Sequence, residues 1–213
     1  MPERPRLTPE MADVRRAVRE LLASVAKPGE LVLVGLSGGA DSLALAAASA
    51  FEAPKLGLRA GAVIVDHGLQ AGSADVAARA AEQARALELD PVVIRPVEVI
   101  AADGPEADAR TARYAALEAV RGEVGAAWVL LAHTLDDQAE TVLLGLTRGA
   151  GATSLAGMAA VTGTLLRPLL GIRRAQTEAA CAGAQLEAWS DPHNEDSAYT
   201  RVRIRREVLP VLE

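Results

Sequence analysis

The chain of 213 residues has little cysteine and few aromatic residues, and each shortage excludes a class of protein. Its single cysteine, Cys181, excludes an internal disulfide and any Cys-x-x-Cys metal or redox motif. No apolar run reaches the roughly 18–20 residues that a membrane span needs, and the first ten residues lack the apolar stretch of a signal peptide. We therefore expect a cytoplasmic protein with no membrane partner.

Composition also limits the core and the surface. Aromatic residues make up 2% of the chain and hydrophobic residues 50%, so Ala, Val and Leu must build the core. The net charge of −6 argues against a surface that binds nucleic acid all over, although a local basic patch remains compatible with RNA binding. The length allows one domain, or one domain with a small appendage.

The stretch LVLVGLSGGADSLAL, residues 31–45, predicts a buried strand, a tight glycine loop and the start of a helix. The loop consists of Ser37, Gly38, Gly39, Ala40, Asp41 and Ser42. Glycines let the backbone adopt positive φ and let a ligand approach closely, and the amides at a helix N-terminus attract anions. The loop is therefore a candidate phosphate site, and the alternative is an ordinary turn between a strand and a helix.

Predicted strands and helices alternate along the chain. Strands are expected over residues 31–36, 59–66, 91–99 and 128–132, with a strand or hairpin over 162–170. Helices are expected over residues 8–26, 40–51, 73–88, 106–123, 174–186 and 197–213, and one follows residue 136. This alternation predicts an α/β fold with a mostly parallel five-stranded sheet sandwiched by helices. We expect a main domain over residues 1–170 and a short helical extension over residues 171–213.

Polar residues follow two of the predicted strands. Asp66 and His67 follow the second strand, and His133 follows the fourth. Parallel α/β sheets place their ligands beyond the carboxyl ends of the strands, so these side chains and the glycine loop are expected to converge in one cleft. For Asp66 the alternative is a simple turn cap.

Three acidic residues follow His133. Asp136 is the expected N-cap of the next helix, where a carboxylate also suits the helix dipole. Asp137 and Glu140 are three residues apart, so they share a helix face. Two carboxylates that face one pocket suit a cation or an amine.

Arginines gather in two segments. Arg110 and Arg113 share one face of a predicted helix, where two guanidinium groups are able to grip phosphates. The last segment holds Arg201, Arg203, Arg205 and Arg206. In an acidic chain this run is the best local candidate for a phosphate or RNA contact, and the alternative for both groups is a solvated helix face.

The motif SGGADS resembles the SGGxDS loop of the PP-loop ATP pyrophosphatases, and from residue 31 onward the chain resembles the tRNA(Ile)-lysidine synthetases of that superfamily. The motifs that carry this resemblance are VDHGL (65–69), ADARTARY (107–114), AHTLDDQAET (132–141), GATSLAGM (151–158), RPLL (167–170) and DPHNEDSAYTRVRIRREVLP (191–210). The first motif alone indicates only the superfamily, whereas DDQAET and the arginine-rich tail are typical of the lysidine branch.

This resemblance implies a Rossmann-like ATP-binding catalytic domain and a C–N ligase reaction. ATP adenylates O2 of the wobble cytidine of a tRNA(Ile) with a CAU anticodon, and pyrophosphate leaves. The ε-amine of free lysine then attacks C2 and displaces AMP, giving lysidine. By resemblance the expected cofactors are ATP and Mg²⁺, and relatives suggest a homodimer.

The resemblance also assigns roles to residues. Those expected to bind ATP and pyrophosphate are Ser37, Gly38, Gly39, Ala40, Asp41, Ser42, Val65, Asp66 and His67. Asp41 would also hold Mg²⁺, because an acid among phosphate-binding amides suits a metal better than an anion. The expected catalytic residues are Asp41, Arg113, His133, Asp137 and Arg205. The expected lysine-binding residues are His133, Asp137 and Glu140. The expected tRNA contacts follow instead from the arginine-rich segments themselves and are Arg110, Arg201, Arg203 and Arg206.

The sequence departs from the family pattern at Thr134, where many relatives have a second histidine, and at Val202, where the tail often has asparagine. One alternative function is another PP-loop tRNA modification, cytidine 2-thiolation, which the single cysteine disfavours. A second alternative is a non-catalytic nucleotide-binding module, which would need the glycine loop but not His133, Asp137 or Glu140.

Overall fold

The computed structural model of the protein describes residues 7–68, 72–98, 105–147, 149, 156–190 and 200–212. Parts of three family-like motifs, residues 69, 151–155 and 191–199, lie outside the described residues. The loop predicted around residues 148–158 is therefore described only at residue 149 and from residue 156 onward.

A six-stranded sheet with the order β3-β2-β1-β4-β6-β5 forms the centre of the fold. Its strands are β1 (Leu31–Gly35), β2 (Arg59–Asp66), β3 (Val92–Pro96), β4 (Trp128–Leu130), β5 (Val161–Thr162) and β6 (Leu165–Leu166). Five of them are parallel, and β5 pairs antiparallel with β6. In the central strand β1, Leu33 lies opposite Gly61 of β2 and Val129 of β4. The predicted mostly parallel sheet is confirmed, and the sixth strand arises because residues 161–166 form a hairpin.

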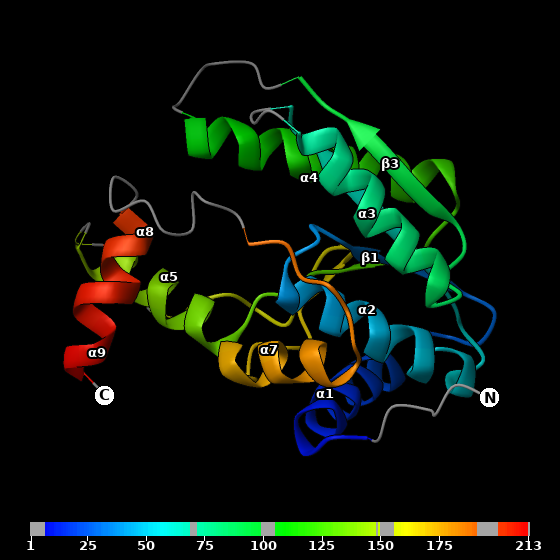
Figure 1. The fold of residues 1–213 in the computed structure, drawn as a ribbon, viewed down its shortest axis with the longest axis horizontal. Helices are drawn as coiled ribbons and strands as arrows, with labels where there is room; N and C mark the ends of the chain where they lie inside the picture. The colour runs from blue at the N-terminus through cyan, green and yellow to red at the C-terminus, as the bar shows by residue number, and fades with distance from the viewer. Residues whose placement is uncertain are drawn as a thin grey trace.

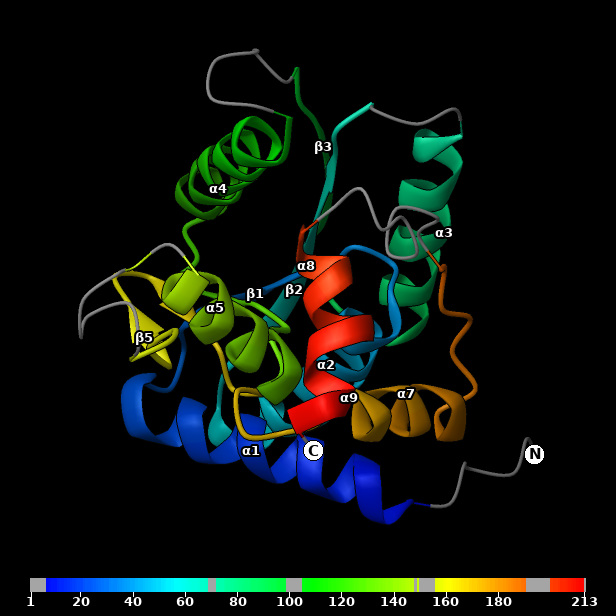
Figure 2. The same ribbon diagram turned by 90° about the vertical axis from the view of Figure 1, so that its left-hand side faces the viewer.

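Helices cover both faces of this sheet, as Figures 1 and 2 show. The helices are α1 (Pro9–Val25), α2 (Ala40–Glu52), α3 (Ser73–Ala86), α4 (Pro105–Glu123), α5 (Leu135–Thr147), α7 (Arg174–Gly183), α8 (Thr200–Arg203) and α9 (Leu209–Leu212). A 3₁₀ turn, η1 (Pro54–Leu56), follows α2, and a π-helical segment, η3 (Ile204–Val208), joins α8 to α9.

The two faces of the sheet bury separate apolar clusters. The larger cluster packs α1, α2, α3 and α7 against one face, with side chains such as Val18, Leu45 and Ala81. The smaller cluster packs α4 against the other face through Leu117 and Val120. Because the strands are covered on both sides, they are almost continuously apolar, as parallel strands usually are.

The first helix shows how the sequence sets an element boundary. Thr8 is the N-cap of α1, its hydroxyl accepts a hydrogen bond from the Met11 amide, and Pro9 occupies the first helical position. Val14 and Leu22 lie on the buried side of the helix. This helix and its cap are therefore confirmed as predicted.

The proposed division at residue 170 stays a prediction. Helix α7, which belongs to the predicted extension, packs against α1 and α2 in the larger cluster. Within the described ranges, none of the helices has the length and apolarity needed to cross a membrane.

Candidate active site

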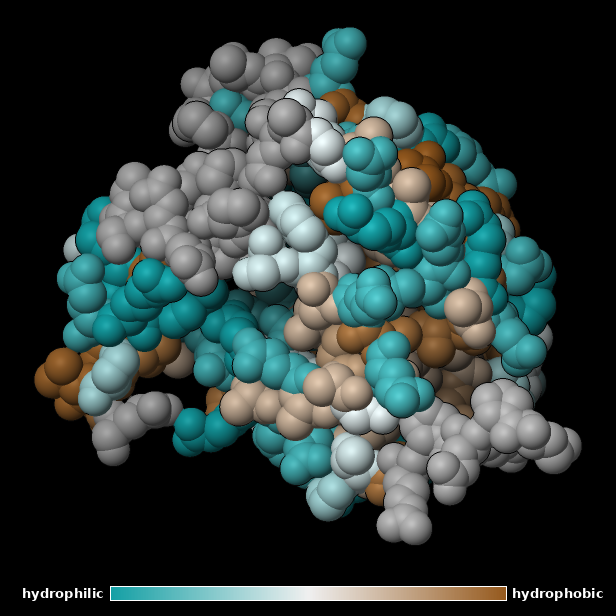
Figure 3. Space-filling model, viewed as in Figure 1, coloured by the Kyte–Doolittle hydropathy of each residue, from teal (hydrophilic) through white to brown (hydrophobic). Residues whose placement is uncertain are grey.

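A cavity of about 810 Å³ opens beyond the carboxyl ends of β1, β2 and β4. It is within the range of about 300–1,000 Å³ that is typical of small-molecule sites. Predicted site residues that line it are Ser37, Gly39, Ala40, Asp41, Ser42, Val65, Asp66, His67, Arg113, His133, Asp137 and Arg205. The surface is hollowed on the face drawn in Figure 3, and hydrophilic side chains border the hollow. The structure thus brings together residues that are up to 168 positions apart in the sequence.

The glycine loop has the geometry of an anion site. Gly38 has a φ of +85°, which L side chains rarely adopt, whereas Gly39 has a φ of −75° and is the N-cap of α2. Gly39 offers no side-chain cap, so the first-turn amides of α2 are left for a ligand. Ser42 closes the loop, because its hydroxyl accepts a hydrogen bond from the Ser37 amide (3.2 Å) and donates one to the Gly39 carbonyl (2.9 Å).

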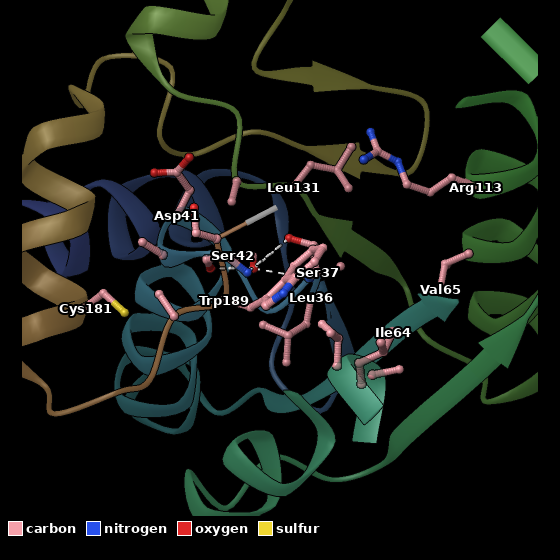
Figure 4. A pocket seen from close by; sticks show the side chains of 18 of the residues that line it. Leu36, Ser37, Asp41, Ser42, Ile64, Val65, Arg113, Leu131, Cys181 and Trp189 are labelled. Carbon is pink, nitrogen blue, oxygen red and sulfur yellow. Dashed lines mark hydrogen bonds between the residues drawn. The ribbon is translucent and has the colours of Figure 1, made fainter. Parts of the chain in front are cut away.

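The segment after α7 supports this loop. The Trp189 amide donates a hydrogen bond to the Gly38 carbonyl (2.9 Å), and Trp189 itself lines the cavity. Gln83 of α3 holds the same segment by hydrogen bonds in both directions with the Glu187 backbone. Figure 4 shows the Trp189 side chain beside Ser37 and Ser42. The loop is thus held from the side of α3 and α7 and left open toward the cavity.

Asp41, in the first turn of α2, lies against α7. The Thr177 hydroxyl, which is fully buried, donates a hydrogen bond to one of its carboxylate oxygens. Burial raises the pKa of Asp41, the Thr177 hydrogen bond and the Arg174 charge oppose that shift, and the Asp137 charge adds to it. The folded protein therefore disfavours the charged form of this carboxylate, and keeping the charge lowers the free energy of unfolding.

Arg174, at the first position of α7, is the centre of the acidic part of the site. Its guanidinium lies 2.8 Å from Asp137 Oδ1, 3.6 Å from Asp41 Oδ2 and 3.6 Å from Glu140 Oε1. Its backbone amide also donates a hydrogen bond to Asp136 Oδ2 (2.8 Å). One arginine therefore contacts carboxylates from both α2 and α5.

The N-cap of α5 is Thr134, so the prediction that Asp136 caps this helix is wrong. The Asp137 Oδ2 atom accepts hydrogen bonds from the Thr134 amide (2.8 Å) and hydroxyl (3.0 Å). The Thr134 hydroxyl in turn lies 3.4 Å from the Asp137 amide, which completes a reciprocal cap. Asp136 is instead engaged by the start of α7. The cap thus fixes the orientation of the Asp137 carboxylate.

Glu140 is fully buried and does not line the cavity. Its Oε1 atom accepts a hydrogen bond from Arg205 Nε (2.7 Å) and lies near Arg174, while its Oε2 atom has no hydrogen-bond partner among the described residues. Arg205 and Arg174 both line the cavity, so Glu140 contacts the two arginines that border it. Its predicted role as a lysine ligand stays a prediction.

The opposite wall of the cavity is cationic and contains two neutral imidazoles. Arg113 points into the cavity from α4, on the side away from Asp41 (Figure 4). In the described part of the chain its Nε atom and the Nδ1 atoms of His67 and His133 are buried without a hydrogen-bond partner. Burial, and then the Arg113 charge, lower the pKa of both histidines, that of His133 to about 4. The Arg113 Nε–H is a buried donor without a partner on a cationic side chain, which suits a bound anion.

The low pKa of His133 predicts a pH dependence of stability. The unfolded chain takes up the imidazole proton near pH 6.5, whereas the folded chain takes it up only near pH 4, so stability falls as the pH drops through this window. Between pH 7.5 and pH 5 we expect the free energy of unfolding to fall by about 2 kcal/mol more in the wild type than in His133→Asn. Urea denaturation at the two pH values measures this difference, and equal losses in both proteins would contradict it.

Two of the four predicted tRNA contacts, Arg110 and Arg201, lie near Arg113 of the cavity wall. Arg110 is exposed on α4, where its guanidinium stacks over the Tyr114 ring and donates a hydrogen bond to the Tyr114 hydroxyl (3.1 Å). Arg203 and Arg206 are exposed on the C-terminal helical segment, and the Arg201 charge acts on Arg113. None of these four arginines lines the cavity.

Sequence reasoning missed three residues of this site: Arg174, Thr177 and Trp189. Arg174 could have been expected from the sequence, because the several carboxylates predicted in the cleft require a nearby cation. Thr177 and Trp189 gave no signal, because their positions depend on how the segment after β6 packs. Cys181 lines the cavity, and burial raises the pKa of its thiol to about 11, so it is a protonated side chain and not a thiolate.

The donor atoms near the loop fit a magnesium ion only in part. Among the described residues there is no group of three or more His, Cys, Asp or Glu side chains that would hold a metal by itself. Mg²⁺ commonly uses one or two carboxylates and takes its other ligands from phosphates and water. Asp41 fits this type of shared site, since its carboxylate lies at the edge of the phosphate loop.

Three comparisons place the chain among known proteins. The profile of the PP-loop domain family matches residues 11–212. The chain is 67% identical to a tRNA(Ile)-lysidine synthase of Leifsonia xyli subsp. xyli over 186 residues, which are 87% of this chain and 56% of that protein. It is 58% identical to a tRNA(Ile)-lysidine synthase of Thermobifida fusca over 205 residues, 96% of this chain and 63% of that one. The chain thus spans about three fifths of the length of these curated relatives.

The fold is similar to a solved structure as well. The U34-tRNA thiolase NcsA from Methanococcus maripaludis, solved with its [4Fe-4S] cluster, superposes with a TM-score of 0.77 at 20% identity. The match covers 96% of this chain and 73% of that one. At this identity the likeness supports the fold alone.

Proposed function

The chain belongs to the PP-loop domain family, and from this premise we propose that it binds ATP and forms lysidine on a tRNA(Ile) with a CAU anticodon. The proposal is carried by one observation, the convergence of an anion-binding loop and an acidic cluster on a single cavity. The high identity to tRNA(Ile)-lysidine synthases supports it further.

The first half-reaction joins the cytidine O2 atom to the α-phosphate of ATP and releases pyrophosphate. In this proposal the first-turn amides of α2, together with Ser37, bind the phosphates. Mg²⁺ would share Asp41 with the phosphate oxygens and supply charge neutralisation for the leaving pyrophosphate. Arg113 lies across the cavity from Asp41, so it would contact the phosphate or the adenylated base from the other side.

The second half-reaction requires an amine nucleophile. Free lysine carries a protonated ε-amine with a pKa of about 10.4, so the site must bind an ammonium ion and take its proton. Asp137 is the carboxylate with an oxygen directed to Arg174 and the cavity, which makes it the proposed partner of the amine. Because the pKa of His133 is about 4, its imidazole stays neutral and adds no second charge beside Arg113.

The chemistry of the chain disfavours a sulfur donor. Enzymes of the thiolation type use paired cysteines or an iron–sulfur cluster, whose ligands are thiolates. This chain has one cysteine, and its thiol is protonated at neutral pH because burial raises its pKa to about 11. Cytidine 2-thiolation is therefore disfavoured within these 213 residues.

The proposal is tested by incubating the protein with ATP, Mg²⁺, radiolabelled lysine and a CAU-anticodon tRNA(Ile) transcript. Label recovered in the RNA with an equal amount of AMP is the expected result. Release of AMP and pyrophosphate without label would point to another nucleophile. Absence of ATP turnover, with nucleotide binding retained, would favour the alternative of a non-catalytic nucleotide-binding module.

The proposal extends to the partners. Arg110, Arg201, Arg203 and Arg206 are proposed to contact the tRNA. Arg110 and Arg201 lie near Arg113 of the cavity wall, and Arg203 and Arg206 are exposed on the same C-terminal segment as Arg201. A homodimer is proposed from family likeness alone, and light scattering tests it.

A further inference from the structure

Arg174 occupies the place where the proposed function requires an amine. Its Nη2 atom donates a hydrogen bond to Asp137 Oδ1 (2.8 Å), the carboxylate assigned to the substrate ammonium. The Arg174 side chain is 19% exposed and lines the cavity, so it is in direct reach of an incoming ligand. A guanidinium and an ammonium are both cations that donate hydrogen bonds, so they are alternatives at this carboxylate.

The same guanidinium also reaches the phosphate loop. Its Nε atom lies 3.6 Å from Asp41 Oδ2, and Nη1 lies 3.6 Å from Glu140 Oε1. Within the described ranges, the ion-pair partners of Asp41, Asp137 and Glu140 are the two arginines Arg174 and Arg205. The three carboxylates therefore exceed the two cations by one charge, and Glu140 Oε2 has no partner in the described structure. Among these described residues, the carboxylates outnumber the cations even with Arg174 in place.

These contacts connect the nucleotide side of the cavity with the amine side. A cation that arrives at Asp41 repels Arg174 from that carboxylate and replaces its charge. With that cation in place, the departure of Arg174 destabilises the Asp137 carboxylate less than it would in the free protein. Two sites that share one movable cation are coupled in free energy, and the coupling is reciprocal.

We propose that Arg174 is a positioning residue that occupies the amine site of the free protein and yields Asp137 to lysine once magnesium–nucleotide binds at Asp41. The inference rests on the proposed function and adds an order of binding to it. The nucleotide would bind first, and lysine would be admitted only to a protein that is ready to adenylate the tRNA. This order would keep the amine out of the site while the nucleotide is absent.

Isothermal calorimetry of lysine binding tests this coupling without any turnover. The full chain is titrated with L-lysine, first alone and then saturated with Mg²⁺ and a non-hydrolysable ATP analogue. For the wild type we expect lysine to bind about tenfold more tightly in the second titration, within the usual range of allosteric coupling. In the absence of nucleotide, we expect Arg174→Gln to bind lysine more tightly than the wild type does. The ratio of its lysine dissociation constants without and with nucleotide should be close to one.

Two further variants control this experiment. Arg173→Gln removes the same charge from the exposed neighbouring residue, and we expect it to keep the ratio of the wild type. Arg174→Lys keeps a cation on a shorter side chain, and we expect an intermediate ratio even if Arg174→Gln fails to fold. An unchanged tenfold ratio in both Arg174 variants would overturn this inference and leave the proposed function standing. Failure of lysine to bind the wild type under either condition, with nucleotide binding intact, would overturn the proposed function as well.

Discussion

Replacing Asp41 with asparagine is expected to slow tRNA-dependent pyrophosphate release from ATP by about 10³-fold. The estimate follows from the several kcal/mol that a metal contributes at a phosphoryl group, with each 1.36 kcal/mol worth a factor of ten in rate. The rate is measured without lysine, so that only the first half-reaction is followed. The Mg²⁺ dependence should also become weak, because the proposed protein ligand is lost.

This loss of activity should occur without loss of stability. Burial raises the pKa of Asp41, so the charged carboxylate disfavours folding at neutral pH, and the asparagine variant should melt at or above the temperature of the wild type. Asp75→Asn is the matched control, because Asp75 is an exposed acid in the first turn of α3. Full Mg²⁺ dependence with an unaltered rate in Asp41→Asn would refute its role as a metal ligand.

The sequence predicted the sheet and the position of the cleft because both follow from local pattern. Continuous apolar runs mark β1 and β2, and the glycine loop between β1 and α2 has one residue, Gly38, at positive φ. Parallel strands end at one edge, so polar residues at those ends had to meet. Residues as distant as Ser37 and His133 therefore line the same cavity, as expected.

The interior of the site was not predictable in the same way. The N-cap of α5 lies two residues earlier than expected, because Thr134 and Asp137 cap each other and leave Asp136 to bind the start of α7. The position of Arg174 depends on the long-range packing of α7 against α1 and α2, which no local pattern specifies. Outside the site, the sequence left open whether residues 162–170 form a strand or a hairpin, because β5 is two residues long and too short to show a periodicity.

Replacing Asp137 with asparagine is expected to separate the two half-reactions. Adenylation should stay within about threefold of the wild type, while transfer of lysine to the adenylated tRNA should fall by about 10²-fold, the usual contribution of a proton-accepting carboxylate. Asparagine keeps the size of the side chain and one oxygen for the Thr134 cap. It removes the negative charge that would bind the ammonium. Single-turnover assays on tRNA that has already been adenylated measure the second step by itself.

The structural role of Asp137 must be separated from this chemical one, because its carboxylate also caps α5 and binds Arg174. Thr134→Val removes the hydroxyl side of the cap and leaves the carboxylate in place. It should cost about 1 kcal/mol of stability, as lost caps usually do, with both half-reactions affected equally. If Asp137→Asn also slowed both steps equally, its effect would come from the helix cap and not from the amine. A selective loss of the second step in Asp137→Asn alone would place the lysine ammonium at the carboxylate that Arg174 contacts.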